Sequence, residues 1–575
     1  MEDNASNRPV VALVGAELEE NLSLRYLAGS LEAAGFQAVI VALREEGEYE
    51  RLVQEVLASR AILVGISVPF QLRAGELLGT ATALRARGYT GHITCGGHFA
   101  TFEFTNLLNR FGAIDSVVRH EGEATLVALA NLVRDESPVP AMPGLVLREQ
   151  GTVVVGDKRP LPPLDSLPFP VRDGAPHDIL GVACAPLVGS RGCYADCSFC
   201  CIYAYAENAQ GARYRMRSVE NIVAEMRAEY HGRGVRLFVF HDDNFFVPYL
   251  PTNKKRYQRM AELLHEEGMD DIGLVIKCRP NDVDEELFSL LKHMGMIRAY
   301  VGIETNSDEG IVSLNRRITS DDNRRALSVL KKLGVYHSFN VLLFDPEATL
   351  QGISRNLDFM EEFADSPFNF CRAEVYAGTP LKKILELENR LTGDYLAWGY
   401  SMREPRVELL FRIASTAFAA RNFKHDGTAN LNMGLRFDGE VFRRFYPSVW
   451  SAELQEKIRA LSERIGNDTV ANLRRALDFV TTCDLTSSRA VNDFTLTLAR
   501  AVSRADLAFT VETKALRREM ESLVRTVGGP SGDKRYAATM RPWAAESQRL
   551  GNSIGLELSS EILPAPSVVE VGHGN

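Results

Sequence analysis

The chain is poor in cysteine and in long apolar runs, and each shortage excludes a class of protein. Nine cysteines in 575 residues, with a polar start and no signal peptide, do not make a disulfide framework, so we expect a reduced, cytoplasmic protein. No apolar run approaches the roughly 20 residues that cross a bilayer, which argues against a membrane protein. The 65 basic residues are outnumbered by 75 acidic ones and form no dense stripe, so nucleic acid is not an expected partner.

The length of the chain predicts several domains. Its 575 residues exceed the usual domain size of about 100–200 residues. From shifts in the sequence pattern we expect four segments: residues 1–140, a hairpin and proline-rich linker at 141–182, residues 183–392 and residues 393–575. The stretch from Leu161 to Pro170 marks the linker, because it holds too many prolines for a helix or an inner strand.

The first segment alternates short apolar runs with stretches of helical period, which is typical of a doubly wound α/β sheet. Expected strands are residues 10–14, 38–42, 61–67, 92–95 and 116–119, with helices near 22–34, 49–58, 74–87, 102–111 and 123–134. The predicted fold class is therefore α/β, with a flavodoxin-like (Rossmann-like) first domain. Ligands of such sheets bind at the carboxyl ends of the strands, so the residues that follow each strand are the candidate ligand contacts.

A second alternation of strands and helices follows the linker. Expected strands are residues 187–190, 237–240, 274–278, 299–303, 338–343 and 370–375. Six parallel strands with helices outside would form a partial (β/α)6 barrel of the TIM type, with functional groups at the strand ends. Beyond about Gly393 the pattern is mainly helical, at 407–421, 470–481, 488–505 and 511–525. The family resemblance described below implies that this C-terminal domain shapes or caps the substrate pocket, and residues 423–427, Asn430 and Asn432 are polar enough to contribute.

Three of the cysteines stand within eight residues, in the pattern CxxxCxxC: Cys193, Cys197 and Cys200. A cluster of four irons held by three thiolates keeps one iron open, which indicates chemistry rather than electron storage. Zinc is the alternative, with Cys201 as a fourth thiol, but adjacent side chains diverge and no second ligand pair follows at finger spacing. The other five cysteines are scattered, mostly in apolar runs, and are interpreted as small buried residues.

This spacing, with Phe199 just before the third cysteine, resembles the signature of radical S-adenosylmethionine enzymes. The resemblance implies a 4Fe–4S cluster on the three cysteines, whose open iron binds S-adenosylmethionine and splits it to a 5′-deoxyadenosyl radical. Strand ends of the predicted barrel are similar to the family's, although residues 344–349 lack its usual glycines and no adenine contact is assigned there. The implied S-adenosylmethionine contacts are Phe199, Asp242, Asp243, Asn244, Arg279, Glu304, Arg317 and Gly378.

The first domain, placed ahead of such a barrel, resembles the cobalamin-binding domain of one large branch of these enzymes. The implied cobalamin contacts are Gly15, Ala16, Glu17, Ser67, Val68, Pro69, Phe70, Gln71, Gly96, Gly97, His98, Glu121, Gly122 and Glu123. Domains that ligate cobalt through histidine carry DxHxxG after the first strand, and residues 15–21 hold no histidine. This predicts cobalt without a histidine lower ligand from that loop, which favours methyl transfer. A flavodoxin-like sheet that binds nothing, or only another domain, is the alternative.

Together these resemblances imply a cobalamin-dependent radical S-adenosylmethionine enzyme. We expect a C-methyltransferase acting on an unactivated carbon of a biosynthetic, natural-product intermediate. One S-adenosylmethionine would be the radical source and another the methyl donor, through methylcobalamin. The cofactors carry the chemistry, so no protein acid or base is assigned. Expected partners are a small-molecule or peptide substrate and a reductase or flavodoxin-type electron donor.

Other functions remain open at this point. A cobalamin radical enzyme that cyclises, oxidises or rearranges its substrate without methylation is the runner-up. A corrinoid or redox binding protein without catalysis is the alternative from another class. A transfer-RNA-modifying methylthiotransferase would want a basic face and further cluster cysteines, and the sequence has neither.

Overall fold

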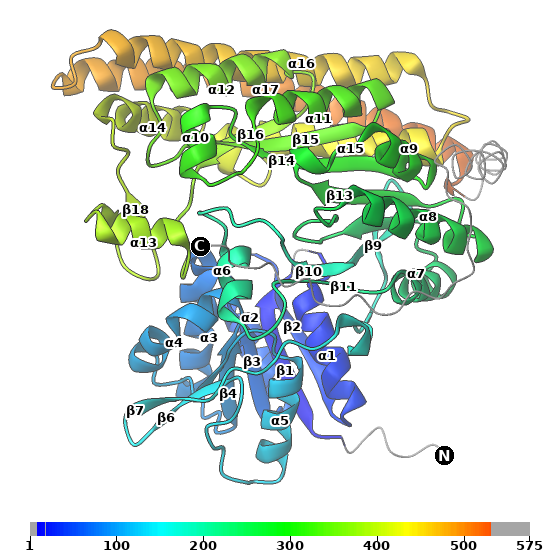
Figure 1. Ribbon diagram of the computed structural model, residues 1–575, viewed down its shortest axis with the longest axis vertical. Coiled ribbons are helices and arrows are strands. Elements are labelled where there is room, and N and C mark those ends of the chain that lie inside the picture. Colours follow the sequence, from blue (N-terminus) through cyan, green and yellow to red (C-terminus); the bar gives the residue numbers. More distant parts are fainter. Residues whose placement is uncertain (1–7, 18, 46, 531–575) are drawn as a thin grey trace.

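The computed structural model describes residues 8–17, 19–45 and 47–530, which form three stacked parts (Figure 1). The first α/β domain lies at one end, a curved second sheet lies in the middle, and a set of long helices lies at the other end. Among the helices of the described residues, none is long and apolar enough to cross a membrane.

The first domain is a parallel sheet in the order β2-β1-β3-β4-β5, which is the flavodoxin-like order. Its strands are β1 (Val10–Ala16), β2 (Gln37–Leu43), β3 (Leu63–Ser67), β4 (His92–Gly96) and β5 (Ser116–Val118). Its helices are α1 (Leu22–Ala33), α2 (Tyr49–Ser59), α3 (Ala74–Ala86), α4 (His98–Arg110) and α5 (Glu123–Arg134). Val11 and Ala12 point into separate apolar cores on the two faces, as the apolar strand sequences require.

The hairpin expected in the linker extends the first sheet. Strand β6 (Leu145–Glu149) pairs antiparallel with β5, and β7 (Thr152–Val155) pairs with β6 at the edge. Residues up to 155 therefore pack with the first domain, and the proline-rich stretch that follows leads to the barrel.

The second sheet has the order β16-β15-β14-β13-β12-β9-β8, with six parallel strands and β8 antiparallel at one edge. Its strands are β8 (His177–Ile179), β9 (Val182–Leu187), β12 (Leu237–Phe240), β13 (Gly273–Cys278), β14 (Met296–Glu304), β15 (Tyr336–Phe344) and β16 (Phe368–Arg372). The helices are α7 (Val219–Arg233), α8 (Leu250–Glu266), α9 (Glu285–His293), α10 (Asp308–Ser313), α11 (Ser320–Leu333), α12 (Leu350–Glu362) and α13 (Pro380–Leu387). The predicted partial six-stranded barrel is confirmed.

The first barrel strand lies earlier than residues 187–190, where it was expected. Strand β9 covers Val182–Leu187, and β8 pairs with its outer edge. Residues 190–192 instead form β10 (Ser190–Gly192), which pairs antiparallel with β11 (Tyr214–Met216) outside the barrel sheet. The apolar run from Val182 to Val188 is continuous, so its composition alone does not show where the strand ends.

Four helices form the C-terminal part: α14 (Pro405–Ala417), α15 (Thr428–Phe445), α16 (Ala452–Thr482) and α17 (Ser488–Val527). Helix α15 was not predicted, and the two helices expected at 488–505 and 511–525 are one helix of 40 residues. Helix α15 packs against β14, β15 and β16, while α16 packs against α12. The bundle therefore closes one side of the curved sheet. A short pair, β17 (Leu391–Thr392) and β18 (Gly399–Tyr400), precedes it.

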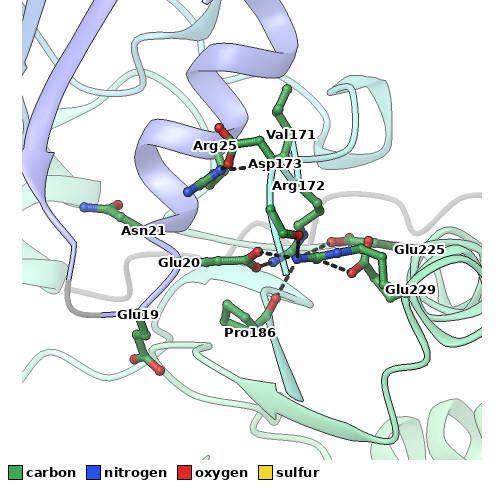
Figure 2. A network of polar contacts seen from close by, with 12 residues as sticks. Glu19, Glu20, Asn21, Arg25, Val171, Arg172, Asp173, Pro186, Glu225 and Glu229 are labelled. Atoms are coloured by element: carbon green, nitrogen blue, oxygen red, sulfur yellow. Dashed lines mark hydrogen bonds and ion pairs between the residues drawn. The ribbon is translucent and has the colours of Figure 1, made fainter. Parts of the chain in front are cut away.

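A buried ionic network joins the first domain to the barrel (Figure 2). Arg172 of the linker pairs with Glu20, which precedes α1, and its Nη2 lies 2.9 Å from the carboxylate of Glu225 on α7. Glu20 also accepts from Arg233 at 3.0 Å. The Arg172 and Glu225 side chains are only 6% and 3% exposed, so this junction is held by charges removed from water.

Candidate functional site

The three motif cysteines lie on a loop between β10 and the helix α6 (Cys201–Asn208). Gly192 begins the loop with φ 86°, and a Cβ atom there would collide with the carbonyl oxygen of Arg213. Only glycine fits this tight approach of the two strands. Cys197 is buried, whereas Cys193 and Cys200 are partly accessible.

Two buried arginines hold the sulfur of Cys197. Nη1 of Arg279 and Nη1 of Arg316 each lie 3.2 Å from its Sγ. Arg279 follows β13, and Arg316 follows the helix α10, so both come from strand-end loops of the barrel. Arg317, which is expected to contact S-adenosylmethionine, is 70% exposed and pairs with Asp196.

The three thiols of the loop are the candidate donors for a metal centre. Across the described ranges, no three histidine, cysteine, aspartate or glutamate side chains converge to hold one metal ion. Thiolates of a four-iron cluster each bind a different iron, so they need not converge on one point. Burial raises the pKa of Cys193 to about 11, which keeps the free thiol protonated until a metal displaces the proton. Cys201 begins α6 and is buried, and burial raises its pKa to about 12.

The three polar residues after β12 face different surroundings. Asp242 is buried and accepts from the amide of Gly189 at 2.9 Å and from Oγ of Ser190 at 2.6 Å. The amide nitrogen of Asn244 donates to the carbonyl of Phe246 at 2.8 Å. Asp243 instead lines a cavity, accepts from the amide of Gly192 at 3.0 Å, and has its pKa raised to about 6 by the surrounding protein. Of the three, Asp243 has a carboxylate available to a bound cation.

Glu304 ends the central strand β14 in a strained conformation. Its φ is 64°, a value that residues with side chains rarely adopt and that gathers at functional sites. Burial raises the pKa of its carboxyl group, against the opposing effect of Arg316 and Arg279. Within the described residues this carboxyl has no hydrogen bond or ion pair, so it is a free acceptor at the strand end.

Two further residues predicted to contact S-adenosylmethionine, Phe199 and Gly378, lie at packing interfaces. Phe199 packs at the edge of the barrel core. Gly378 has φ 75°, and a Cβ there would collide with the ring of Phe102 on α4. The turn at residues 378–380 therefore lies against the first domain.

A large cavity lies between the first domain and the cysteine loop. It encloses about 1400 Å³ of space, its opening included. Eight of the predicted cobalamin contacts line it: Ser67, Pro69, Gly96, Gly97, His98, Glu121, Gly122 and Glu123. Its other wall includes Ser190, Arg191, Gly192, Tyr205 and Asp243 of the barrel. One space thus reaches from the glycine-rich strand ends of the first sheet to the residues next to Cys193.

The remaining predicted cobalamin contacts lie outside the lining of this cavity: Gly15, Ala16, Glu17, Val68, Phe70 and Gln71. Glu17 pairs with Arg25 at 2.6 Å. Gln71 donates to the carbonyl of Val375 at 2.6 Å, and Phe70 lies 5.5 Å from the ring of Tyr376, so this loop touches the barrel directly.

Two histidines of the first domain line the cavity, and His241 lines it from the barrel side. The ring of His98 lies 4.1 Å from that of Tyr205 on α6, and burial lowers its pKa to about 4. Nε2 of His120 lies 2.9 Å from Oδ1 of Asn208, and burial lowers its pKa to about 4 as well. Both rings are therefore neutral at physiological pH.

Ion pairs that sequence reasoning missed connect the two loops. Nη1 of Arg191 lies 2.9 Å from Glu121 and 2.8 Å from Glu123, and Arg215 also pairs with Glu121. Arg191 stands two residues before Cys193, and Glu121 follows β5. No local sequence pattern predicts these ion pairs, because the two residues of each pair are 68 or more residues apart in the sequence.

The site's chemistry fits both groups that the sequence implies. Three sulfur donors on one loop, with guanidinium groups against one of them, suit an iron–sulfur cluster. A large cavity over glycine-rich strand ends suits a planar corrinoid, which lies against backbone. Cys193, Cys197 and Cys200 would hold the cluster, and the cavity-lining loops of the first domain would hold the corrinoid.

Two parts of the chain match models of known protein families. Residues 187–359 match the model of the radical SAM superfamily, and residues 8–130 match that of the B12 binding domain. An uncharacterized methyltransferase of Pyrococcus horikoshii is 28% identical over 50% of this chain and 62% of its own length. The hopanoid C-3 methylase of Methylococcus capsulatus is 27% identical over 57% of this chain and 61% of its own length. The chain thus spans less than two thirds of these relatives.

A further relative and a solved structure extend the comparison. An anaerobic magnesium-protoporphyrin IX monomethyl ester cyclase of Cereibacter sphaeroides is 25% identical over 54% of this chain and 51% of its own length. The structure of the cobalamin-dependent S-adenosylmethionine radical enzyme OxsB shares the fold, with a TM-score of 0.64 and 18% identity over 94% of this chain and 84% of that one.

The two domain matches fall on the two walls of the cavity. The B12-binding domain brings cobalamin, and the radical SAM domain brings S-adenosylmethionine and its 4Fe–4S cluster. The chain therefore combines a B12-binding domain with a radical SAM domain, in that order.

Proposed function

We propose that this chain is a C-methyltransferase that acts on an unactivated carbon of a biosynthetic, natural-product intermediate. The observation that supports this most directly is the cavity that reaches both the B12-binding loops and the cysteine loop. A methyl carrier and a radical source must face the same substrate carbon, and a shared cavity allows that alignment. The methyltransferase and methylase among the relatives favour the same reaction class.

When bound, one S-adenosylmethionine with the cluster supplies a radical that removes a substrate hydrogen, while cobalamin carries the methyl group of a second S-adenosylmethionine. The chain's own residues bind and orient these groups. Asp243 offers a carboxylate to a cation at the cavity wall. Arg191 and Arg215 hold the cysteine loop against the B12-side loop. The proposal includes a small-molecule or peptide substrate and a flavodoxin-type or reductase electron donor.

The test needs no known substrate. The full chain is reconstituted anaerobically with iron, sulfide and cobalamin, then reduced in the presence of S-adenosylmethionine. We expect S-adenosylhomocysteine, the product left when S-adenosylmethionine gives up its methyl group, in an amount that requires cobalamin. We also expect 5′-deoxyadenosine, which requires the cluster. A preparation with full iron and cobalamin that makes 5′-deoxyadenosine but no S-adenosylhomocysteine would contradict methyl transfer.

A second candidate is a cobalamin radical enzyme that cyclises or oxidises without methylation. The similarity to the anaerobic magnesium-protoporphyrin IX monomethyl ester cyclase favours it. The same experiment separates the two, because a cyclase leaves the methyl group of S-adenosylmethionine in place. A binding protein without catalysis would make neither product.

A further inference from the structure

The inward face of β14, one of the two middle strands among the six parallel ones, is only half-buried. Along β14 the residues alternate, and Ala299, Val301 and Ile303 are fully buried toward the outer helices. Arg298 and Tyr300, on the opposite face, stay partly accessible although the strand lies in the middle of the sheet. Successive residues of a strand point to opposite faces, so the accessible set faces the hollow of the half-barrel. This face is available to a ligand.

Three hydrogen-bond donors gather on this face. Lys277 of β13 pairs in register with Tyr300 of β14, and Arg298 precedes Tyr300 by two residues on the same face. Their side chains therefore occupy neighbouring places on two adjacent strands. The three supply an ammonium, a phenol and a guanidinium group.

None of the three donors forms an ion pair with a carboxylate within the described residues, although the charge of Lys277 opposes the rise in the pKa of Asp242 and Asp243, and Glu304 adds to the rise in the pKa of Tyr300. Nζ of Lys277 lies 3.4 Å from Nδ1 of His241, and Nη2 of Arg298 donates to Oγ of Ser338 at 3.0 Å. The hydroxyl of Tyr300 makes no hydrogen bond to the described chain, and burial raises its pKa, so it remains a donor. Other arginines, such as Arg233 on α7, do pair with carboxylates.

Arg298 is held in place without being neutralised. Its guanidinium carbon lies 5.5 Å from the ring centre of Tyr336 and 5.2 Å from that of Phe437 on α15. Its Nε is buried and has no acceptor. Two aromatic faces fix the direction of the side chain, but a cation away from water is stabilised fully only by an anion.

We propose that Lys277, Tyr300 and Arg298 form the binding site for an anionic group of the substrate, a carboxylate or a phosphate. Naming this anion as part of the substrate rests on the function proposed above. Tyr300 stands four residues before Glu304 on one strand, so the anion would lie about 13 Å along the barrel from that strand end, at the usual strand rise. The anion would thus anchor the substrate in the hollow and leave its other end toward the cysteine loop. The substrate class is a charged metabolite rather than a neutral hydrocarbon.

The test measures anion binding to the full chain without cluster or cobalamin. Inorganic phosphate and acetate are titrated separately by calorimetry at constant ionic strength, with chloride as the background anion. We expect binding of at least one anion in the millimolar range, weakened about tenfold or more in Arg298→Gln and in Lys277→Gln. Tyr300→Phe should weaken it less, since it removes a neutral donor. Tighter binding of phosphate would indicate a substrate phosphate, and tighter binding of acetate would indicate a substrate carboxylate.

The matched control is Arg372→Gln on β16. Arg372 also lies over aromatic rings, 3.7 Å from the centre of Tyr400, and it has no carboxylate partner among the described residues, but its contacts lie outside the three-donor group. The Arg372→Gln variant should bind the anion with the affinity of the unaltered chain. Absence of binding in the unaltered chain, or an equal loss in Arg372→Gln, would overturn the proposal, as would full binding in folded Arg298→Gln. Because no radical chemistry is involved, a chain that binds the anion but forms no S-adenosylhomocysteine would contradict only the methyltransferase.

Discussion

Arg279 donates from Nη1 to Sγ of Cys197 across 3.2 Å, and both residues are buried. A hydrogen bond from a cation to a cluster sulfur stabilises the more negative, reduced cluster and so raises its reduction potential. Arg316 makes the same contact from another loop. Cys197 is thus the motif cysteine whose charge, as a cluster ligand, the protein would compensate most directly.

Arg279→Met should lower the reduction potential of the cluster. The expected shift is roughly 40 mV for each kcal/mol of hydrogen bonding lost. A redox titration followed by paramagnetic resonance measures it. Arg317→Met is the control, because Arg317 is exposed and pairs with Asp196. An equal shift in both variants would mean that general charge, not the contact with Cys197, sets the potential.

Replacing Cys193, Cys197 and Cys200 together by alanine should abolish cluster binding and all cleavage of S-adenosylmethionine. Cys201→Ala should leave the iron content largely unchanged, because three thiolates suffice and the fourth iron stays open. Iron and sulfide analysis after reconstitution gives the answer. Loss of the cluster in Cys201→Ala alone would contradict the three-thiolate assignment.

Asp243→Asn should weaken binding of S-adenosylmethionine more than Asp242→Asn does. The Asp243 carboxylate lines the cavity, whereas that of Asp242 is occupied by Gly189 and Ser190. The raised pKa of Asp243, about 6, means that the carboxyl loses its charge as the pH falls through 6. Binding of S-adenosylmethionine, which carries positive charge, should therefore weaken below pH 6 in the unaltered chain. In Asp243→Asn its affinity should depend less on pH. Equilibrium binding at several pH values tests this, and unchanged affinity in Asp243→Asn would remove it from the site.

Bound cobalamin should lack a histidine nitrogen on cobalt. The loop after β1 has Glu17 held by Arg25, and no histidine among residues 15–21. Paramagnetic resonance of the cobalt(II) form reports a nitrogen lower ligand as a threefold splitting of each cobalt line. We expect no splitting, and the same spectrum for His98→Ala. Splitting that disappears in His98→Ala would instead identify His98 as the ligand.

Arg172→Met should destabilise the junction between the first domain and the barrel. It leaves the buried carboxylates of Glu20 and Glu225 without this partner, and breaking such a pair costs about 3–5 kcal/mol. Denaturant unfolding measures the loss. Arg51→Met is the control, because its pairs with Glu48 and Glu55 are more exposed and exposed pairs contribute about 0–1 kcal/mol. Similar losses in both variants would show that burial of the network is unimportant.

The first domain and the six-stranded barrel could be predicted because their strands are short apolar runs with local period. The boundary of β9 could not, since the apolar run passes without a break from Val182 to Val188. Helix α15 was missed because polar residues such as Asn430 and Asn432 begin it, and their contacts come from other elements. Asn430 meets Asn369 of β16, and Asn432 accepts from Ser462.

Within the site, the cysteines and the acidic strand ends were visible as motifs, but the environment of each residue was not. Asp242 and Asp243 look alike in sequence, yet one is enclosed by hydrogen bonds and the other faces the cavity. Arg316 and Arg317 are likewise adjacent, and only the buried one reaches Cys197. Such differences arise from the direction in which a loop leaves its strand, which depends on contacts far away in the sequence.

The pairing of Arg191 with Glu121 and Glu123 means that the two cofactor loops are assembled as one unit. A shift of the loop that carries Cys193, the first proposed cluster ligand, should therefore also move the loop that follows β5. A substitution that displaces one of these two loops should therefore displace the other. Substitutions of Glu121 and Glu123 that weaken cobalamin binding should also lower the iron content, although they leave the three motif cysteines unchanged.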